Sequence, residues 1–271
     1  MIDLAAPLVL VGAGKMGGAM LAGWLDRGLP PAGVTILDPA LHESAGSFLA
    51  RGVRHAESPA AIDGAARVLV LAVKPQSMAT VLPSVVPLVG PETIVVSVAA
   101  GTPLATIGAV LGSGPIVRVM PNTPAQVGRG MSACIGNAAV GDGERRLVTA
   151  LMDAIGETAW LDDEGEIDAV TGVSGSGPAY VFYLVECLAA AGRAQGLAPD
   201  LAMVLARQTV TGAGELLHRS DLSAATLRQN VTSPNGTTFA ALEVLMAPDG
   251  LEPLMTAAVA AATARARGLA G

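Results

Sequence analysis

The fold is decided by the stretch Leu8-Val9-Leu10-Val11-Gly12-Ala13-Gly14-Lys15-Met16-Gly17-Gly18-Ala19-Met20, near the start of the chain. A short apolar run, typical of a buried strand, leads into a glycine cluster, and the residues that follow read as a helix. Gly12, Gly14 and Gly17 fill the pattern G-x-G-x-x-G between strand and helix, the context in which this pattern indicates a dinucleotide site. The first glycine permits the turn, the second lets a pyrophosphate approach, and the third lets the helix lie close to the strand. We therefore predict dinucleotide binding here, with a purely structural turn as the alternative.

Strand-like and helix-like segments alternate from this stretch to about residue 162. Further strands are predicted at Val34–Leu37, Val68–Val73, Thr93–Val98, Ile116–Met120, Met131–Gly136 and Thr158–Leu161. Helices are predicted at Met16–Arg27, Leu41–Arg51, Ser77–Val86, Pro103–Leu111 and Gly143–Ile155. Short, fully apolar strands that alternate with helices predict a parallel sheet covered on both faces. Residues 1–162 are thus expected to form an α/β domain with a doubly wound, Rossmann-type sheet.

The second half of the chain reads differently, since no convincing strand follows Asp163. Helices are predicted at Glu164–Thr171, from Pro178 to about Gly192, and at Pro199–His218, Ala224–Gln229, Thr237–Met246 and Leu251–Gly268. Many of these helices are rich in alanine nearly all round, which indicates burial on more than one face. Residues 163–271 are therefore expected to form an all-α domain that packs against a second copy, giving a homodimer or a higher oligomer of dimers.

Composition narrows the class of protein. The 271 residues are 51% hydrophobic and 14% charged, and the net charge of −7 argues against a nucleic-acid surface. No basic segment precedes the first apolar run, and no uninterrupted apolar segment is long enough to span a bilayer. Cys134 and Cys187 have no metal-binding spacing, and we expect both to be buried and reduced. These features predict a cytoplasmic protein without a metal site or a membrane partner.

Asp38 ends the second predicted strand, where an acidic residue can accept hydrogen bonds from the adenosine ribose of NAD and would repel the 2′-phosphate of NADP. The alternative is an aspartate that only opens the turn before Pro39. Three further strand ends reach the same edge of the sheet: Ala72-Val73-Lys74-Pro75, Ser97-Val98-Ala99-Ala100-Gly101 and Val119-Met120-Pro121-Asn122-Thr123-Pro124. Ligands of open α/β sheets bind at this edge, so a nicotinamide is expected there.

Groups that could donate a proton are scarce. Lys15 and Lys74 are the two lysines of the chain, and neither lies in the helical half. We interpret the three histidines, at positions 42, 55 and 218, as surface histidines or histidines with satisfied hydrogen bonds rather than as catalytic residues. A carbonyl reductase needs a proton donor, whereas an imine is basic enough to arrive protonated, so the sequence favours reduction of an imine.

Two polar clusters interrupt the helical half: Thr171-Gly172-Val173-Ser174-Gly175-Ser176-Gly177-Pro178-Ala179-Tyr180 and Asn230-Val231-Thr232-Ser233-Pro234-Asn235-Gly236-Thr237-Thr238. Each precedes a predicted helix, whose first backbone N–H groups can bind an anion. Helix capping alone would account for one hydroxyl residue in each cluster. We therefore expect the second cluster to hold a substrate carboxylate.

Together these segments resemble the pyrroline-5-carboxylate reductase family over essentially the whole chain. The resemblance rests on residues 12–16, 72–75, 120–124, 174–180 and 231–238, of which the last two are the family's most specific signatures. It implies a Rossmann domain followed by a helical domain that interlocks with its partner into a dimer. The implied reaction is reduction of 1-pyrroline-5-carboxylate to L-proline with NADP(H) or NAD(H), in proline biosynthesis.

The resemblance also implies roles for single residues. Val231, Ser233, Gly236, Thr237 and Thr238 should surround the substrate carboxylate, and Thr238 should contact the ring nitrogen as the catalytic hydroxyl. The cofactor should contact Gly12, Ala13, Gly14, Lys15, Met16, Gly17, Asp38, Ala72, Val73, Lys74, Pro75, Ala99, Ala100, Gly101, Met120, Pro121 and Asn122, the last six of which should border the nicotinamide. Asn235 stands where relatives often have glycine, and Asp38 where many have a residue compatible with a 2′-phosphate.

Two other functions stay open from the residues alone. A Rossmann reductase of the β-hydroxyacid or ketoacid type would share the fold, although the helical half lacks the lysine that such enzymes often use. A nucleotide sensor without catalysis would share the glycine motif. Turnover of hydroxyacids, or cofactor binding without turnover of any cyclic imine, would favour these alternatives.

Overall fold

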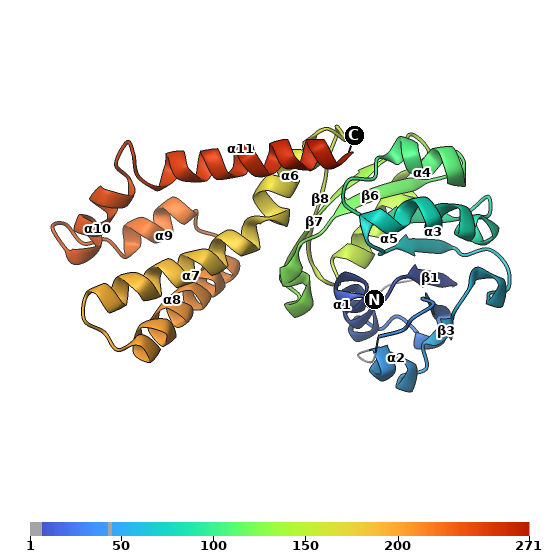
Figure 1. Cartoon of the computed structure of the whole chain (residues 1–271), viewed down its shortest axis with the longest axis horizontal. Coiled ribbons are helices and arrows are strands. Elements are labelled where there is room, and N and C mark those ends of the chain that lie inside the picture. The colour runs from blue at the N-terminus through green and yellow to red at the C-terminus, as the bar shows by residue number, and fades with distance from the viewer. Residues whose placement is uncertain (1–6, 43–44, 271) are drawn as a thin grey trace. The chain divides into compact units, whose positions relative to one another are not determined.

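The structure is a computed structural model that describes residues 7–42 and 45–270 (Figure 1). Two compact units divide the chain: Met1–Gly175 together with Thr263–Gly271, and Ser176–Ala262. The boundary between two independently folding domains that we predicted at residues 162 and 163 stays a prediction.

The first unit is built on one eight-stranded sheet with the strand order β3-β2-β1-β4-β5-β6-β7-β8. The strands are β1 Leu8–Val11, β2 Val34–Leu37, β3 Arg54–Ala56, β4 Val68–Leu71, β5 Ile94–Ser97, β6 Ile116–Met120, β7 Gly130–Gly136 and β8 Gly156–Trp160. The order from β3 to β6 is the doubly wound order of dinucleotide-binding domains, with β1 beside β4 where the direction of winding reverses. The predicted Rossmann-type fold is confirmed.

The sheet differs from the prediction in two places. β3 was not predicted, because Arg54 and His55 are exposed at the sheet edge and give no apolar signal. β6 and β7 pair antiparallel, whereas a wholly parallel sheet was expected. The reason is the link of residues 121–129, which is shorter than the dozen or more residues that a parallel crossover needs.

Helices cover both faces of the sheet, and successive side chains of a strand point to opposite faces. The helices of this unit are α1 Lys15–Asp26, α2 Gly46–Ala50, α3 Met78–Val85, α4 Leu104–Leu111, α5 Asp142–Met152 and α6 Glu166–Val170. Leu8 and Leu10 of β1 pack in the cluster that contains residues of α1 and α5. Val9 and Val11 pack on the other side, in the cluster that contains residues of α3 and α4. This division explains why β1 and β4 are apolar at every position.

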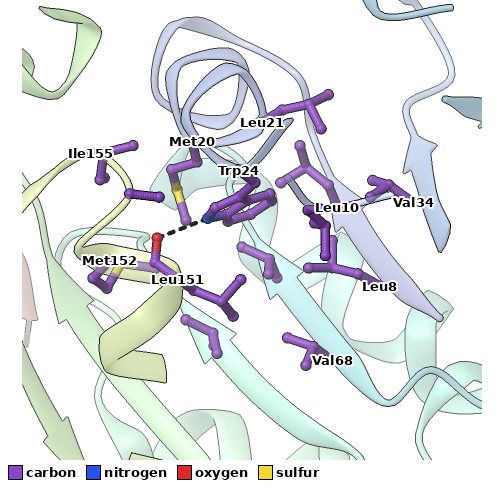
Figure 2. Packing of buried hydrophobic residues seen from close by; sticks show 14 of the residues in the cluster. Leu8, Leu10, Met20, Leu21, Trp24, Val34, Val68, Leu151, Met152 and Ile155 are labelled. Carbon is purple, nitrogen blue, oxygen red and sulfur yellow. Dashed lines mark hydrogen bonds between the residues drawn. The ribbon is translucent and has the colours of Figure 1, made fainter. Parts of the chain in front are cut away.

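Trp24 is the largest side chain in the first of these clusters, and it is fully buried (Figure 2). Its indole Nε1–H donates a hydrogen bond of 2.9 Å to the carbonyl oxygen of Leu151 on α5. The bond satisfies the one polar group of the ring inside the core and ties α1 to α5. It thereby fixes the helix that follows the glycine loop.

The second unit is helical, as predicted. Its helices are α7 Gly177–Ala194, α8 Pro199–Arg219, α9 Ala224–Asn230, α10 Thr237–Leu245 and the first part of α11 Leu251–Ala270, whose last residues belong to the first unit. α7 and α8 pack against each other. Many large apolar side chains of this unit are exposed in the single chain, among them Phe182, Val204 and Val244. Cys187 on α7 is exposed too, so the expected burial is found only for Cys134.

None of the described helices combines the length and the apolar character needed to cross a bilayer.

Candidate functional site

The glycine loop between β1 and α1 has the geometry that dinucleotide binding requires. Gly12 has a φ of +87°, and a Cβ there would lie 2.9 Å from the carbonyl oxygen of Ala72. A Cβ on Gly17 would lie 2.2 Å from the carbonyl oxygen of Gly12, so only glycine lets α1 pack this close to the loop. In contrast, a Cβ on Gly14 would meet no atom within 4 Å. Gly14 thus faces open space at the N-terminus of α1, where the first N–H groups lack partners within the helix.

Open space in front of this loop forms two cavities. The first, about 500 Å³, is lined by Ala13, Gly14, Lys15, Gly18, Ala19, His42, Phe48 and Gln126. The second, about 270 Å³, lies where the carboxyl ends of β1, β2 and β4 come together, and its lining includes Gly12, Asp38 and Val73. A glycine loop, a helix N-terminus and a cavity at the reversal of the sheet fit a dinucleotide. These residues are the part of the predicted set that the structure brings together most closely.

Asp38 has the turn role that the sequence left open as an alternative, and its carboxylate also bonds to the glycine loop, while its contact with a ribose stays a prediction. Its Oδ1 accepts a hydrogen bond of 3.0 Å from the backbone N–H of Ala40, which closes the turn after β2. Its Oδ2 accepts a bond of 3.2 Å from the N–H of Ala13 in the glycine loop. The carboxylate is therefore held beside the loop and at the wall of the 270 Å³ cavity.

The end of β4 supports the same loop. The Ala72 backbone and the Val73 side chain lie against Gly12, and the Ala72 methyl group lies against Gly17. Lys74 precedes the short 3-10 turn Pro75–Ser77 in extended conformation. Of the predicted segment 72–75, the first two residues thus hold the glycine loop in place.

Both ends of the side-chain amide of Asn122, which follows β6, bond to protein partners. Its Oδ1 accepts a hydrogen bond of 2.8 Å from the N–H of Met131. Its Nδ2 donates to the carbonyl oxygen and to the hydroxyl of Ser174, at 3.2 Å each. Asn122 therefore fixes the first polar cluster to the edge of the sheet.

The first polar cluster does not simply precede a helix. Thr171–Gly175 forms a π-helical turn between α6 and α7. A Cβ on Gly175 would lie 2.7 Å from the terminal methyl group of Met120, so the glycine permits this close approach. Pro178 is the second residue of α7 rather than the first, because the helix begins at Gly177.

Gly101, in the predicted segment 99–101, has a φ of +70°. A Cβ there would lie 3.0 Å from the carbonyl oxygen of Leu269, near the end of α11. Ala99 is buried after β5. The structure therefore gives these two residues packing roles, and their contact with a cofactor stays a prediction.

In the second unit, residues 231–236 form a turn that leads into α10, whose first two residues are Thr237 and Thr238. Gly236 is the residue before the helix, and its N–H donates a bond of 3.0 Å to the carbonyl oxygen of Ser233. A Cβ on Gly236 would lie 2.3 Å from the Ser233 hydroxyl, so a larger residue here would force the Ser233 side chain to move. Asn235, with a φ of +56°, is the non-glycine residue with positive φ in the described part of the chain. This conformation explains why glycine suits position 235.

The start of α10 offers N–H groups and hydroxyls together. The helix begins at Thr237, no side chain caps it, and its first turn holds no acidic residue. Thr238 is half-buried, while Ser233 and Thr237 are exposed. The Thr232 hydroxyl donates instead to the carbonyl oxygen of Arg228, at 2.6 Å. The loop can therefore receive a carboxylate, as its predicted role requires.

Sequence reasoning missed several residues that line the two cavities. Glu57, Ser58, Thr80 and Ser84 belong to the smaller cavity, and Phe48 and Gln126 to the larger one. They lie outside the motifs, in segments that reach the glycine loop only through the fold. Among the described residues, no group of histidine, cysteine or acidic side chains could hold a metal ion.

Known families match both halves of the chain. Residues 164–269 match the family model for pyrroline-5-carboxylate reductase dimerisation, and residues 7–101 match that for NADP oxidoreductase, coenzyme F420-dependent. Pyrroline-5-carboxylate reductase of Pseudomonas aeruginosa is 41% identical over 97% of this chain and 96% of its own length. That of Glycine max is 37% identical over 94% and 93%.

Solved structures agree with these matches. A pyrroline-5-carboxylate reductase from Coxiella burnetii superposes with a TM-score of 0.91 at 33% identity, over 99% of this chain and 100% of the other. The Plasmodium falciparum pyrroline carboxylate reductase with NADP bound superposes with a TM-score of 0.82 at 27% identity, over 98% and 99%. By its sequence identity to these relatives and its match to the dimerisation model, the chain belongs to the pyrroline-5-carboxylate reductase family.

Proposed function

We propose that this chain reduces 1-pyrroline-5-carboxylate to L-proline with NADH or NADPH, the last step of proline biosynthesis. The observation that carries the proposal is its 41% identity to a pyrroline-5-carboxylate reductase over 97% of the chain. The geometry supports it, because the chain has both a glycine loop for a dinucleotide and a separate helix N-terminus suited to a carboxylate. The β-hydroxyacid alternative is not favoured by these relatives.

The cofactor is proposed to bind along the glycine loop and the ends of β2 and β4. Gly12, Gly14 and Gly17 give the backbone its close approach, the start of α1 receives the pyrophosphate, and Asp38 lies beside the adenosine ribose. Ala99–Gly101 and Met120–Asn122 are proposed to border the nicotinamide. When bound, the reduced nicotinamide supplies the hydride that C5 of the substrate ring accepts.

The substrate is proposed to bind at residues 231–238. Backbone N–H groups at the start of α10 hold its carboxylate, with the hydroxyls of Ser233 and Thr237 and the backbone of Val231 and Gly236 around it. Thr238 is proposed to contact the ring nitrogen. Because the cyclic imine arrives protonated, this chain has to orient the ring and exclude water rather than supply a strong acid.

A homodimer, which can assemble further, is part of the same proposal. The dimerisation model matches residues 164–269, and the second unit exposes a large apolar surface in the single chain. A second copy would cover that surface. A cytoplasmic location is also proposed, and cell fractionation tests it.

The proposed substrate site is tested with Thr238→Ala. Loss of one hydrogen bond to the substrate, worth about 1–3 kcal/mol, should lower kcat/KM for 1-pyrroline-5-carboxylate by roughly tenfold to a hundredfold. Thr232→Ala is the matched control, since its hydroxyl donates to the carbonyl oxygen of Arg228 in α9, and it should lower kcat/KM less. Unchanged kinetics of Thr238→Ala would contradict the assigned role.

A second arm of this experiment tests the reaction class. The wild type is assayed in parallel with β-hydroxyacids and with 1-pyrroline-5-carboxylate. Turnover of hydroxyacids without turnover of the cyclic imine would contradict the proposed reaction. Binding of a dinucleotide without turnover of either substrate class would favour a nucleotide sensor.

A further inference from the structure

The smaller cavity beside the glycine loop is the place where the ribose end of a dinucleotide would meet the protein. It is about 270 Å³ in volume and is bounded by the ends of β1, β2 and β4, at the reversal of the sheet. Its polar lining consists of Asp38, Glu57, Ser58, Thr80 and Ser84. No lysine, arginine or histidine belongs to this lining. The cavity is therefore acidic.

The Asp38 carboxylate is fixed at this wall rather than free to turn away. Both of its oxygens already accept a backbone hydrogen bond, from Ala13 at 3.2 Å and from Ala40 at 3.0 Å. The backbone after β2 is held too, since the His55 ring donates to the carbonyl oxygen of Asp38 at 2.8 Å. A carboxylate has about four sites for hydrogen bonds, so two remain for hydroxyl groups of a ribose.

A 2′-phosphate would find no lysine or arginine in the segment that follows β2. Between Arg27 and Arg51 the sequence contains no lysine or arginine. Arg51 itself forms an ion pair of 3.1 Å with Asp26. Of the other basic side chains nearby, Lys15 and His42 line the larger cavity at the start of α1, and the His55 ring bonds to the Asp38 carbonyl oxygen without lining the smaller cavity.

Glu57 adds a second negative charge. It follows β3 directly, and β3 lies beside β2 at the sheet edge, so the acidic ends of both strands reach the same cavity. Glu57 is exposed and has no role in the core. A phosphate placed in this cavity would be repelled by two carboxylates, whereas a ribose with a free 2′-hydroxyl would gain an acceptor.

We propose that this chain selects NADH over NADPH, with Asp38 as the main discriminating residue and Glu57 as a second one. The inference rests on the proposed function for the reaction that the cofactor serves, but the cofactor preference can be measured without any substrate. It also gives a role to the edge strand β3, which places Glu57.

Binding is tested first, by calorimetric titration of the full chain with NAD⁺ and with NADP⁺ at fixed salt. We expect the Kd for NAD⁺ to be lower by about tenfold or more, because the phosphate brings two further negative charges to an acidic cavity. Asp38→Asn removes the charge and keeps one oxygen for the Ala13 N–H, at the loss of the exposed bond from the Ala40 N–H, so the ratio of the two Kd values should fall to within about threefold. Glu57→Gln should reduce the ratio by about twofold to fivefold, since its carboxylate is more exposed.

Glu157→Gln is the control, because Glu157 is an exposed carboxylate on β8, at the opposite end of the sheet. It should leave the ratio unchanged. A wild type that binds NADP⁺ as tightly as NAD⁺ or more tightly would overturn the proposal. If the ratio of the Kd values for NADP⁺ and NAD⁺ were unchanged in both Asp38→Asn and Glu57→Gln, the assignment to these residues would be overturned.

Steady-state kinetics with NADH and NADPH then separates this inference from the proposed function. The kcat/KM values with 1-pyrroline-5-carboxylate should show the same preference as the binding constants. Selective binding of NAD⁺ without any turnover would contradict the proposed function and leave the cofactor preference standing. Turnover with NADPH preferred would support the proposed function and overturn the preference.

Discussion

The two units of the chain differ in how far they bury their large apolar side chains. In the first unit, Leu8, Trp24 and Ile94 are completely buried by residues of the same chain. In the second, Phe182 of α7, Val204 of α8 and Val244 of α10 are 64%, 61% and 72% exposed. Exposed apolar surface on this scale marks an interaction site, because water is a poor solvent for it. The first unit thus buries its large apolar side chains within the chain, whereas the second leaves an apolar surface for a partner to cover.

The two candidate sites, the glycine loop and the turn 231–236, differ in the contacts that hold them in place. The glycine loop is held by contacts within its own unit, through Ala72, Asp38 and the packing of α1. The turn 231–236 is held mainly by local hydrogen bonds, such as that from the Gly236 N–H to Ser233. We expect cofactor binding to be robust to changes in the helical unit, and substrate binding to depend on its assembly.

The largest effect is expected from Phe182→Glu, which puts a charge into the apolar surface of α7. A charge buried in an apolar interface costs several kcal/mol, so the protein should sediment as a monomer of 27.0 kDa. Its kcat/KM for 1-pyrroline-5-carboxylate should fall by at least about a hundredfold. NAD⁺ binding should persist. Sedimentation and calorimetry measure these quantities.

Val110→Glu on α4 is the matched control, since Val110 is an exposed valine of the first unit, 39% accessible. It should leave mass and activity unchanged. A Phe182→Glu protein that remained dimeric would contradict the inference that a second copy covers the apolar surface of the second unit.

The next effect concerns two glycines of one loop. Gly17→Ala should lower both stability and cofactor affinity, because its Cβ would lie 2.2 Å from the carbonyl oxygen of Gly12. Overpacking of this kind costs about 1–3 kcal/mol or more. Gly14→Ala should fold like the wild type, since its Cβ meets nothing within 4 Å, yet bind the dinucleotide more weakly. Urea unfolding and titration with NAD⁺ separate the two; equal stability of both variants would contradict the packing argument.

A smaller effect is expected in the core of the first unit. Trp24→Phe removes the donor to the Leu151 carbonyl and leaves that oxygen buried without its partner. The free energy of unfolding should fall by about 1–3 kcal/mol, with a further contribution from the lost ring volume. Urea unfolding measures it. Since α1 also carries the glycine loop, cofactor affinity should weaken in parallel; an unchanged free energy would show that the bond contributes nothing.

The smallest effect is expected at Asn235, in the turn of the second unit. Asn235→Ala should destabilise the turn by about 1 kcal/mol, because alanine disfavours the left-handed conformation at a φ of +56°. Asn235→Gly should be neutral or slightly stabilising. The KM for the substrate should rise in Asn235→Ala and stay constant in Asn235→Gly; the reverse order would contradict the backbone explanation.

Much of the first unit could be predicted because its signals are local. The apolar run before Gly12 and the glycine spacing after it describe one strand, one turn and one helix. β3 could not be predicted, since Arg54 and His55 join the sheet through backbone pairing alone. The antiparallel β7 could be recognised only by comparing the length of its connection with what a parallel crossover requires.

The candidate site was predictable where a residue acts through its own motif. Gly12 and Gly17 are examples, and their geometry is as expected. Asn122 is different, because its partners Met131 and Ser174 come from elsewhere in the sequence, and no motif announces that its amide is already used. Glu57 reaches the cavity only because β3 pairs with β2. Contacts of this kind depend on the fold and cannot be read from spacing.

The most direct test of the account is to supply the purified full chain with NADH and 1-pyrroline-5-carboxylate and to quantify L-proline against the NADH consumed. We expect one L-proline for each NADH oxidised, and no product when the cofactor is left out. Oxidation of NADH without formation of L-proline, or no oxidation with either NADH or NADPH, would contradict it.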